Sequence, residues 1–122
     1  LEISMVQLAA TRRTEDQVEA MEETLMTMER HRDDLFLCVE KDIEFHELMA
    51  QATGNRVFEM IHESIAELLS ESRRETMLRS GVNLPVAEHR RILDAIRDKD
   101  QEQAVAAMSA HLDTAELSLK QN

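Results

Sequence analysis

Residues that build turns and sheets are scarce in this sequence of 122 residues. It contains two Gly, one Pro and three Phe, and it has no Trp or Tyr. Sheet proteins need turn residues and favour aromatic and β-branched side chains, so the composition predicts an all-α protein. Hydrophobic residues make up 43% of the chain, which is enough for a folded core and too much for a disordered segment.

Cysteine and basic residues are scarce as well. The single Cys38 excludes an internal disulfide and is typical of a protein from the reducing cytoplasm. The 14 basic residues are outnumbered by 25 acidic ones, which gives a net charge of −11. Nucleic acids and anionic membranes attract clustered Lys and Arg, so the chain as given is a poor candidate for binding either. No apolar run approaches the roughly 20 residues that a membrane-spanning helix needs.

Helix start and stop signals follow one another along the chain with short connections. Thr14 and Gln17 form a capping box, Gly54 supplies a left-handed stop, and Pro85 suits the first turn of a helix. The predicted helices cover residues 1–11, 14–31, 34–53, 56–78, 84–97 and 100–119. The sequence therefore predicts one domain, an antiparallel bundle of about six helices.

Four polar residues occupy positions in these helices where the helical spacing calls for apolar side chains. Asp42 and His46 interrupt the apolar stripe of the third predicted helix and stand one turn apart on one face. His89 and His111 interrupt the stripes of the fifth and sixth helices. Burial of a carboxylate and three imidazoles is unfavourable unless they are paired or coordinated, and one divalent metal satisfies all four. We therefore predict a central metal site, with zinc favoured over nickel, manganese or iron.

Alternatives remain open for these and two neighbouring polar residues. The histidines could instead be metal-free core residues that hydrogen-bond to the backbone or to Asp42. His62 lies on the inward stripe of the fourth helix. It is a candidate for effector binding, for a further metal ligand or for a hydrogen bond to a ligand, although a partly exposed helix residue is the preferred interpretation. Arg73 continues that stripe and suits capture of a carboxylate ligand. A surface ion pair with Glu71 or Glu75 fits Arg73 equally well.

Two segments of the chain resemble the signature of a known family. Asp42-Ile43-Glu44-Phe45-His46, followed by Ala52-Thr53-Gly54-Asn55, is similar to the D-x-x-F-H…A-x-G-N pattern of the FCD domain. This domain is the C-terminal effector-binding part of the FadR subfamily of GntR-type bacterial transcription regulators. The similarity continues through residues 88–96 and 100–112 and reaches back to residues 1–10, so it covers essentially the whole chain.

The resemblance implies a metal site in this domain and DNA binding by a separate domain. It implies that Asp42, His46, His89 and His111 are metal ligands, and that the metal helps to hold a small organic acid. It also places Arg73 near a position where the family often has an arginine facing the effector pocket. The family fold is a bundle of six or seven antiparallel helices, preceded by a winged helix-turn-helix. Because this chain opens in the middle of a helix, we expect it to be a fragment that lacks its N-terminal part. The resemblance then implies that DNA binding belongs to the missing winged helix-turn-helix.

The predicted function is that of a cytoplasmic, ligand-gated regulator domain that forms a homodimer and has no enzymatic activity. Effector binding would favour one arrangement of the bundle and change the spacing of two DNA-reading domains on an operator. A mononuclear metalloenzyme is a weaker alternative, because beside the ligands only Glu44 or Glu88 could be argued as a general base. A metal-free structural dimerisation module is the remaining alternative.

Overall fold

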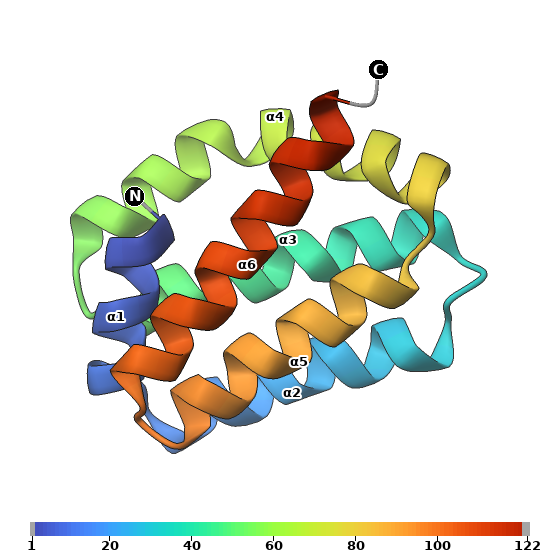
Figure 1. Cartoon of the computed structure of the whole chain (residues 1–122). Coiled ribbons are helices and arrows are strands. Elements are labelled where there is room, and N and C mark those ends of the chain that lie inside the picture. Colours follow the sequence, from blue (N-terminus) through green and yellow to red (C-terminus); the bar gives the residue numbers. More distant parts are fainter. Residues whose placement is uncertain (1, 121–122) are drawn as a thin grey trace.

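The computed structural model describes residues 2–120, with side chains through residue 114, and this part of the chain forms six helices (Figure 1). They are α1 (Glu2–Arg12), α2 (Glu15–Arg30), α3 (Leu35–Ala52), α4 (Arg56–Ser80), α5 (Asn83–Arg97) and α6 (Gln101–Lys120). The predicted all-α helical bundle is confirmed, and each helix overlaps the range that the sequence predicted. The expected start at Leu1 lies outside the described residues.

Side-chain caps explain where four of the helices begin, including α6, where the Asp100 carboxylate accepts a hydrogen bond from the Gln103 amide. The Thr14 hydroxyl accepts a hydrogen bond from the Gln17 amide, and the Gln17 side chain accepts one from the Thr14 amide, so the predicted capping box precedes α2. Asp34 and Asn55 accept hydrogen bonds from backbone amides in the first turns of α3 and α4. Gly54 has a φ of 66°, which provides the left-handed turn between α3 and α4.

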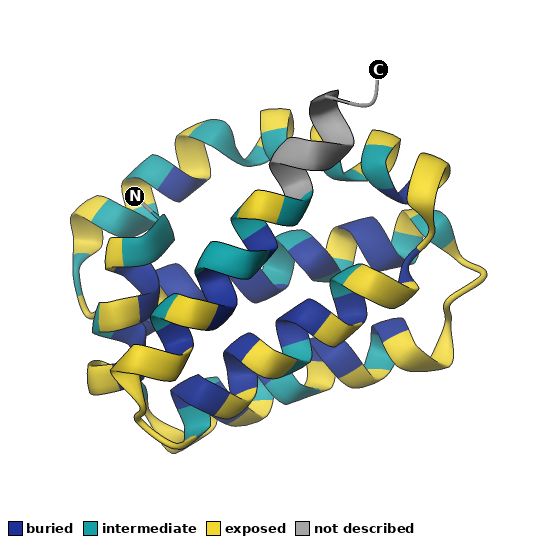
Figure 2. Ribbon diagram, in the orientation of Figure 1, coloured by how far each residue is buried: buried dark blue, intermediate teal, exposed yellow. Residues whose placement is uncertain are grey.

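The helices α3 and α5 each pack against three other helices. α3 packs against α1, α2 and α4, whereas α5 packs against α1, α2 and α6. Figure 2 shows that their inward faces are buried, while the outward faces of α2 and α5 are exposed. Fully buried large apolar residues fill the space between them: Met5, Met21, Leu25, Met28, Phe45, Met49, Ile92, Leu93, Ile96 and Met108. Because this core surrounds α3 and α5, polar groups on their inward faces are shielded from water.

The helix α4 lies at the outside of the bundle. It packs mainly on α3, and only His62 and Met77 among its residues are buried. Val57, Met60 and Leu68 are exposed by 59%, 56% and 76%, so α4 presents large apolar side chains to solvent. Within residues 2–120, no helix has both the length and the apolar content that a membrane crossing requires.

Candidate metal centre

The four polar residues that interrupt the apolar stripes meet in the interior of the bundle. α3 supplies Asp42 and His46, α5 supplies His89 and α6 supplies His111. Their exposed fractions are 0%, 3%, 0% and 2%, so these side chains are removed from solvent. His46, His89 and His111 each offer a ring nitrogen within 4.8 Å of those of the other two. The structure thus brings all four residues together, and their role as metal ligands stays a prediction.

The carboxylate of Asp42 lies beside two of the imidazoles. Its Oδ1 is 3.3 Å from Nε2 of His46 and 3.3 Å from Nε2 of His89, but neither contact has hydrogen-bond geometry. Among the residues that the structure describes, both Asp42 oxygens, Nε2 of His46 and both ring nitrogens of His89 are buried without a hydrogen-bond partner. Folded proteins contain few such groups, because each carries a desolvation penalty. These atoms form a cluster that a cation can satisfy.

Two glutamates contact the outer nitrogens of this cluster. Oε1 of Glu88 lies 2.9 Å from Nδ1 of His111, and Oε2 of Glu2 lies 3.6 Å from Nδ1 of His46. The sequence pattern places neither glutamate in the cluster, and it marks Glu88 only as a candidate general base. Glu88 and His111 stand on different helices and are 23 residues apart, so helical spacing carries no signal for their contact.

Burial and neighbouring charges separate the proton affinities within the cluster. Burial disfavours the charged form of His46, but contacts with Asp42 and Glu2 outweigh it and raise its pKa to about 9. Burial lowers the pKa of His89 to about 3, and the nearby His46 and His111 add to this effect. For Asp42, burial is outweighed by His89 and His46, which hold the pKa of the carboxyl well below its usual range. In the metal-free protein at neutral pH, His46 is therefore protonated and His89 is not, so His46 offsets the charge of Asp42.

An aromatic stack orients the ring of His89. Its plane is 8° from that of Phe45, and the two ring centroids are 4.5 Å apart. Phe45 is itself fully buried between the helices. Because both rings are packed on all sides, the plane of His89 is restricted and its Nε2 stays directed toward Asp42.

Arg73 reaches the edge of the cluster from α4. Its Nη2 lies 3.3 Å from Nε2 of His111, and its Nε lies 4.0 Å from Oδ2 of Asp42. The side chain is 15% exposed, so it stands between the cluster and the solvent. Of the two orientations that the sequence left open, the structure has the inward one rather than a surface ion pair with Glu71 or Glu75.

His62 is buried, and the preference for a partly exposed residue is wrong. Its exposed fraction is 3%, although it belongs to the outer helix α4. Burial lowers the pKa of His62, and the neighbouring charge of His46 lowers it further, so the imidazole is neutral at pH 7. Its Nε2 has no hydrogen-bond partner within the described part of the chain. The sequence overestimated the exposure because α4 is polar over most of its surface.

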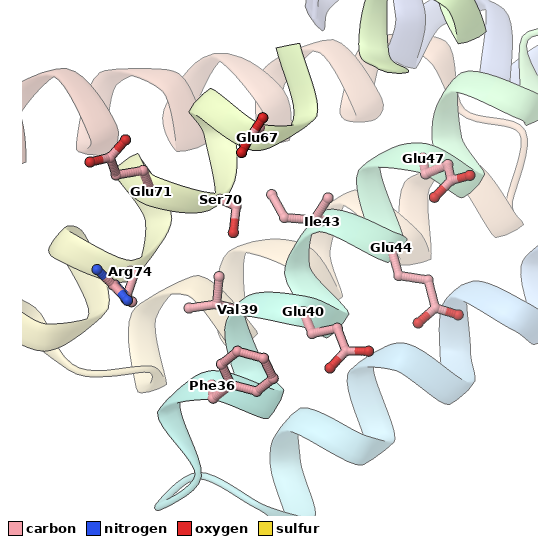
Figure 3. A pocket seen from close by; sticks show the side chains of 10 residues that line it. All are labelled: Phe36, Val39, Glu40, Ile43, Glu44, Glu47, Glu67, Ser70, Glu71 and Arg74. Carbon is pink, nitrogen blue, oxygen red and sulfur yellow. The ribbon is translucent and has the colours of Figure 1, made fainter. Parts of the chain in front are cut away.

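A groove of about 690 Å³ lies between α3 and α4 (Figure 3). Its lining residues are Phe36, Val39, Glu40, Ile43, Glu44, Glu47, Glu67, Ser70, Glu71 and Arg74. None of them belongs to the histidine cluster. This groove is therefore a different feature from the predicted central metal site.

The cluster fits a transition metal in its chemistry and its dimensions. One carboxylate and three imidazoles are ligands that zinc, nickel, manganese and iron accept. Two nitrogens bound to one zinc at about 2.1 Å lie at most about 4.2 Å apart. The three nitrogens lie within 4.8 Å of one another, so a bound metal would draw them somewhat closer together.

Comparisons with known proteins agree with the fold and the sequence pattern. Residues 1–114 match the model of the FCD domain family. The HTH-type transcriptional repressor NanR of Salmonella schwarzengrund is 32% identical over 116 residues, which cover 93% of this chain and 44% of the relative. NanR of Salmonella newport is 31% identical over 116 residues, which cover 93% of this chain and 45% of the relative.

Among solved structures, Streptococcus agalactiae GntR superposes with a TM-score of 0.74 at 27% identity. The match covers 95% of this chain and 53% of that one, so the chain spans about half the length of these relatives. Relatives that are named as transcriptional repressors confirm the expectation of a regulatory rather than an enzymatic domain. Because the family model covers nearly the whole chain, including all four positions of the cluster, the protein belongs to the FCD domain family.

Proposed function

We propose that this chain is the effector-binding domain of a GntR-type transcription regulator of the FadR subfamily, and that it binds a small organic acid with the help of a divalent metal. Asp42, His46, His89 and His111 would hold the metal, with zinc favoured over nickel, manganese or iron. The set of buried polar atoms without partners in this cluster carries the proposal. A bound metal would supply an electrophilic centre for a carboxylate oxygen of the effector.

The charges around the cluster support a cation at this position. Three acidic side chains, Asp42, Glu2 and Glu88, contact the imidazoles. Arg73 and the protonated His46 are the positive groups that face them. Replacement of the His46 proton by a divalent ion would balance the three carboxylates, and balanced buried charges are far less costly than unbalanced ones.

The position of Arg73 supports an acid as the ligand class. A guanidinium binds a carboxylate through two parallel hydrogen bonds, and Arg73 stands where a ligand next to the cluster would meet it. His62 would add a neutral polar contact from the same helix. Together these groups favour a small anion over a neutral or cationic effector.

In this proposal the regulator works in the cytoplasm as a homodimer, and a winged helix-turn-helix outside this chain binds operator DNA. The length of the relatives supports that division, because this chain covers only 44% of the NanR repressor. The exposed Val57, Met60 and Leu68 support dimerisation along α4, since a partner chain would cover these large apolar side chains.

Thermal unfolding of the zinc-loaded chain with a panel of mono- and dicarboxylic acids tests the ligand class. An acid that binds the native state raises Tm as its concentration increases. We expect this rise in the wild type and in Arg74→Ala, the matched control at the neighbouring exposed arginine, and its loss in Arg73→Ala with zinc still bound. If no acid raises Tm while zinc remains bound, the proposed effector class is wrong.

A metal-free core neutralised by Arg73 is the second candidate. The contacts of Arg73 with His111 and Asp42 favour it, because the guanidinium already supplies one positive charge to the cluster. In that case Arg73→Ala should destabilise the protein strongly, and zinc should not restore Tm. If the proposed metal site is correct, added zinc should instead restore the Tm of Arg73→Ala, because the ion compensates for the lost guanidinium charge.

A further inference from the structure

Glu88 and His111 join α5 to α6 through a buried contact at the outer edge of the histidine cluster. The contact between Oε1 and Nδ1 is 2.9 Å long, and the two side chains are 10% and 2% exposed. We propose that Glu88 is a positioning residue, which holds the proton of His111 on Nδ1 and turns the lone pair of Nε2 toward the cluster. This inference rests on the proposed function, because it concerns how the chain prepares one metal ligand.

Two independent contacts require the same position of the proton. A carboxylate only accepts hydrogen bonds, so the contact with Glu88 requires N–H at Nδ1 of His111. A guanidinium only donates, so the 3.3 Å contact with Arg73 requires the lone pair at Nε2. A neutral imidazole carries one proton, and only the Nδ1–H tautomer satisfies both neighbours.

A metal ligand needs the same tautomer. The metal binds the nitrogen that carries the lone pair, and a hydrogen bond from the other nitrogen fixes the ring and makes the ligand more basic. The ring centroids of His46 and His89 lie 5.9 Å and 5.3 Å from that of His111. Since Nδ1 is occupied by Glu88, the nitrogen left for these neighbours and for a metal is Nε2.

Glu2 offers a comparison at the opposite side of the cluster. It lies 3.6 Å from Nδ1 of His46, which is beyond hydrogen-bond distance, and its side chain is 21% exposed. Glu88 is closer to its histidine and more buried, so its contact is the stronger constraint. The positioning role is therefore assigned to Glu88.

Long-range ¹H–¹⁵N correlation spectra of the histidine side chains in the metal-free full chain report the tautomer directly. We expect His111 to carry its proton on Nδ1 in the wild type and in Glu88→Gln, because the amide oxygen can still accept it. Glu88→Leu removes one of the two contacts that fix this proton and leaves only the longer one to Arg73, so part of His111 should shift to the Nε2–H tautomer. Glu19→Leu, at an exposed glutamate of α2, is the matched control and should keep the wild-type spectrum.

Zinc affinity, measured by competition with a chromophoric chelator, supplies the second readout. Loss of such a supporting carboxylate should weaken zinc binding by roughly 10–100-fold in Glu88→Leu. Glu88→Gln should lie between Glu88→Leu and the wild type, and Glu19→Leu should match the wild type. If Glu88→Leu does not fold, Glu88→Gln serves as the test. Its zinc affinity should be weaker than that of the wild type, while its His111 keeps the proton on Nδ1.

The outcomes separate this inference from the proposed function. A wild-type His111 protonated on Nε2, or a tautomer and zinc affinity unchanged in Glu88→Leu, would overturn the positioning role. A Glu88-dependent tautomer in a chain that binds no zinc would support the role of Glu88 and overturn the metal site. A Glu88-dependent tautomer together with weakened zinc binding would support both.

Discussion

At the scale of single residues, His46 and His89 share one carboxylate oxygen and differ in proton affinity. Both Nε2 atoms lie 3.3 Å from Oδ1 of Asp42. His46 has a second acidic neighbour, Glu2, and its pKa is about 9, whereas His89 stacks on Phe45 among two other imidazoles and has a pKa of about 3. The number of charged neighbours, rather than burial alone, decides which imidazole is protonated.

Zinc binding should therefore release a proton from His46 at neutral pH. The ion competes with this proton for the ring, since a bound imidazole must be deprotonated. With a pKa of about 9 for His46, zinc affinity should rise between pH 7 and that value and level off above it. One released proton corresponds to about tenfold in affinity per pH unit. Competition titrations across this range measure the slope, and a pH-independent affinity would contradict the assignment of His46 as a ligand.

Some residues of the cluster can be predicted from the sequence, whereas others depend on contacts between helices that the sequence pattern does not show. Asp42, His46, His89 and His111 are visible because each interrupts an apolar stripe within its own helix. The contact of Glu88 with His111 depends on how α5 lies against α6, which helical periodicity does not encode. The resemblance to the FCD signature predicts the four ligand positions, but it does not predict the contacts of Glu88 and Glu2 with the histidines.

At the scale of helices, local signals determine where the elements begin. The capping box at Thr14, the caps at Asp34 and Asn55, and the left-handed Gly54 each involve residues within a few positions, so their effects are readable in sequence. The environment of α4 was harder to predict. Its inward stripe is mostly half-buried, because α4 packs mainly on one neighbour, α3.

Removal of the Thr14 cap should destabilise the bundle. Thr14→Ala deletes the acceptor for the Gln17 amide and breaks the capping box of α2, which packs on both α3 and α5. We expect the free energy of unfolding to fall by about 1 kcal/mol in urea denaturation. Ser4→Ala, at an exposed site within α1, is the control and should change it by less than about 0.5 kcal/mol. Equal effects in the two variants would argue against the cap.

The exposed apolar residues of α4 lead to a separate prediction about dimerisation. Leu68→Glu should shift the protein from dimer to monomer in sedimentation equilibrium, because it places a charge at an exposed apolar residue of α4. Phe36→Glu, on α3 and equally exposed at 76%, should leave the dimer intact. A wild type that is monomeric at high concentration, or equal effects of the two substitutions, would argue against dimerisation through α4.

At the scale of the whole molecule, the cluster links stability to pH in the metal-free protein. The pKa of His46 is raised from 6.5 to about 9, so its stabilisation is complete below pH 6.5 and is lost as the pH rises through 9. The pKa of His89 is lowered from 6.5 to about 3, so its contribution is present above pH 6.5 and is lost toward pH 3. Glu2, lowered from 4.5 to about 2, adds to the acid-side loss.

Urea denaturation of the metal-free chain from pH 4 to 9 should therefore show greatest stability near pH 6.5. His46→Gln removes the titrating ring, so the free energy of unfolding should decline less between pH 6.5 and 9 than it does in the wild type. His31→Gln, at an exposed histidine after α2, is the control and should keep that decline. If the loss of stability between pH 6.5 and 9 persisted in His46→Gln, a group other than His46 would be responsible for it.

The metal content of the purified, untagged protein tests the central claim most directly. After exposure to zinc and removal of excess metal, elemental mass spectrometry should find about one zinc per chain in the wild type. His89→Ala should lose this metal, whereas the control His31→Ala should keep it, because His31 is exposed and outside the cluster. Absence of bound zinc, nickel and manganese from the folded wild type, or equal metal content in His89→Ala, would contradict the account.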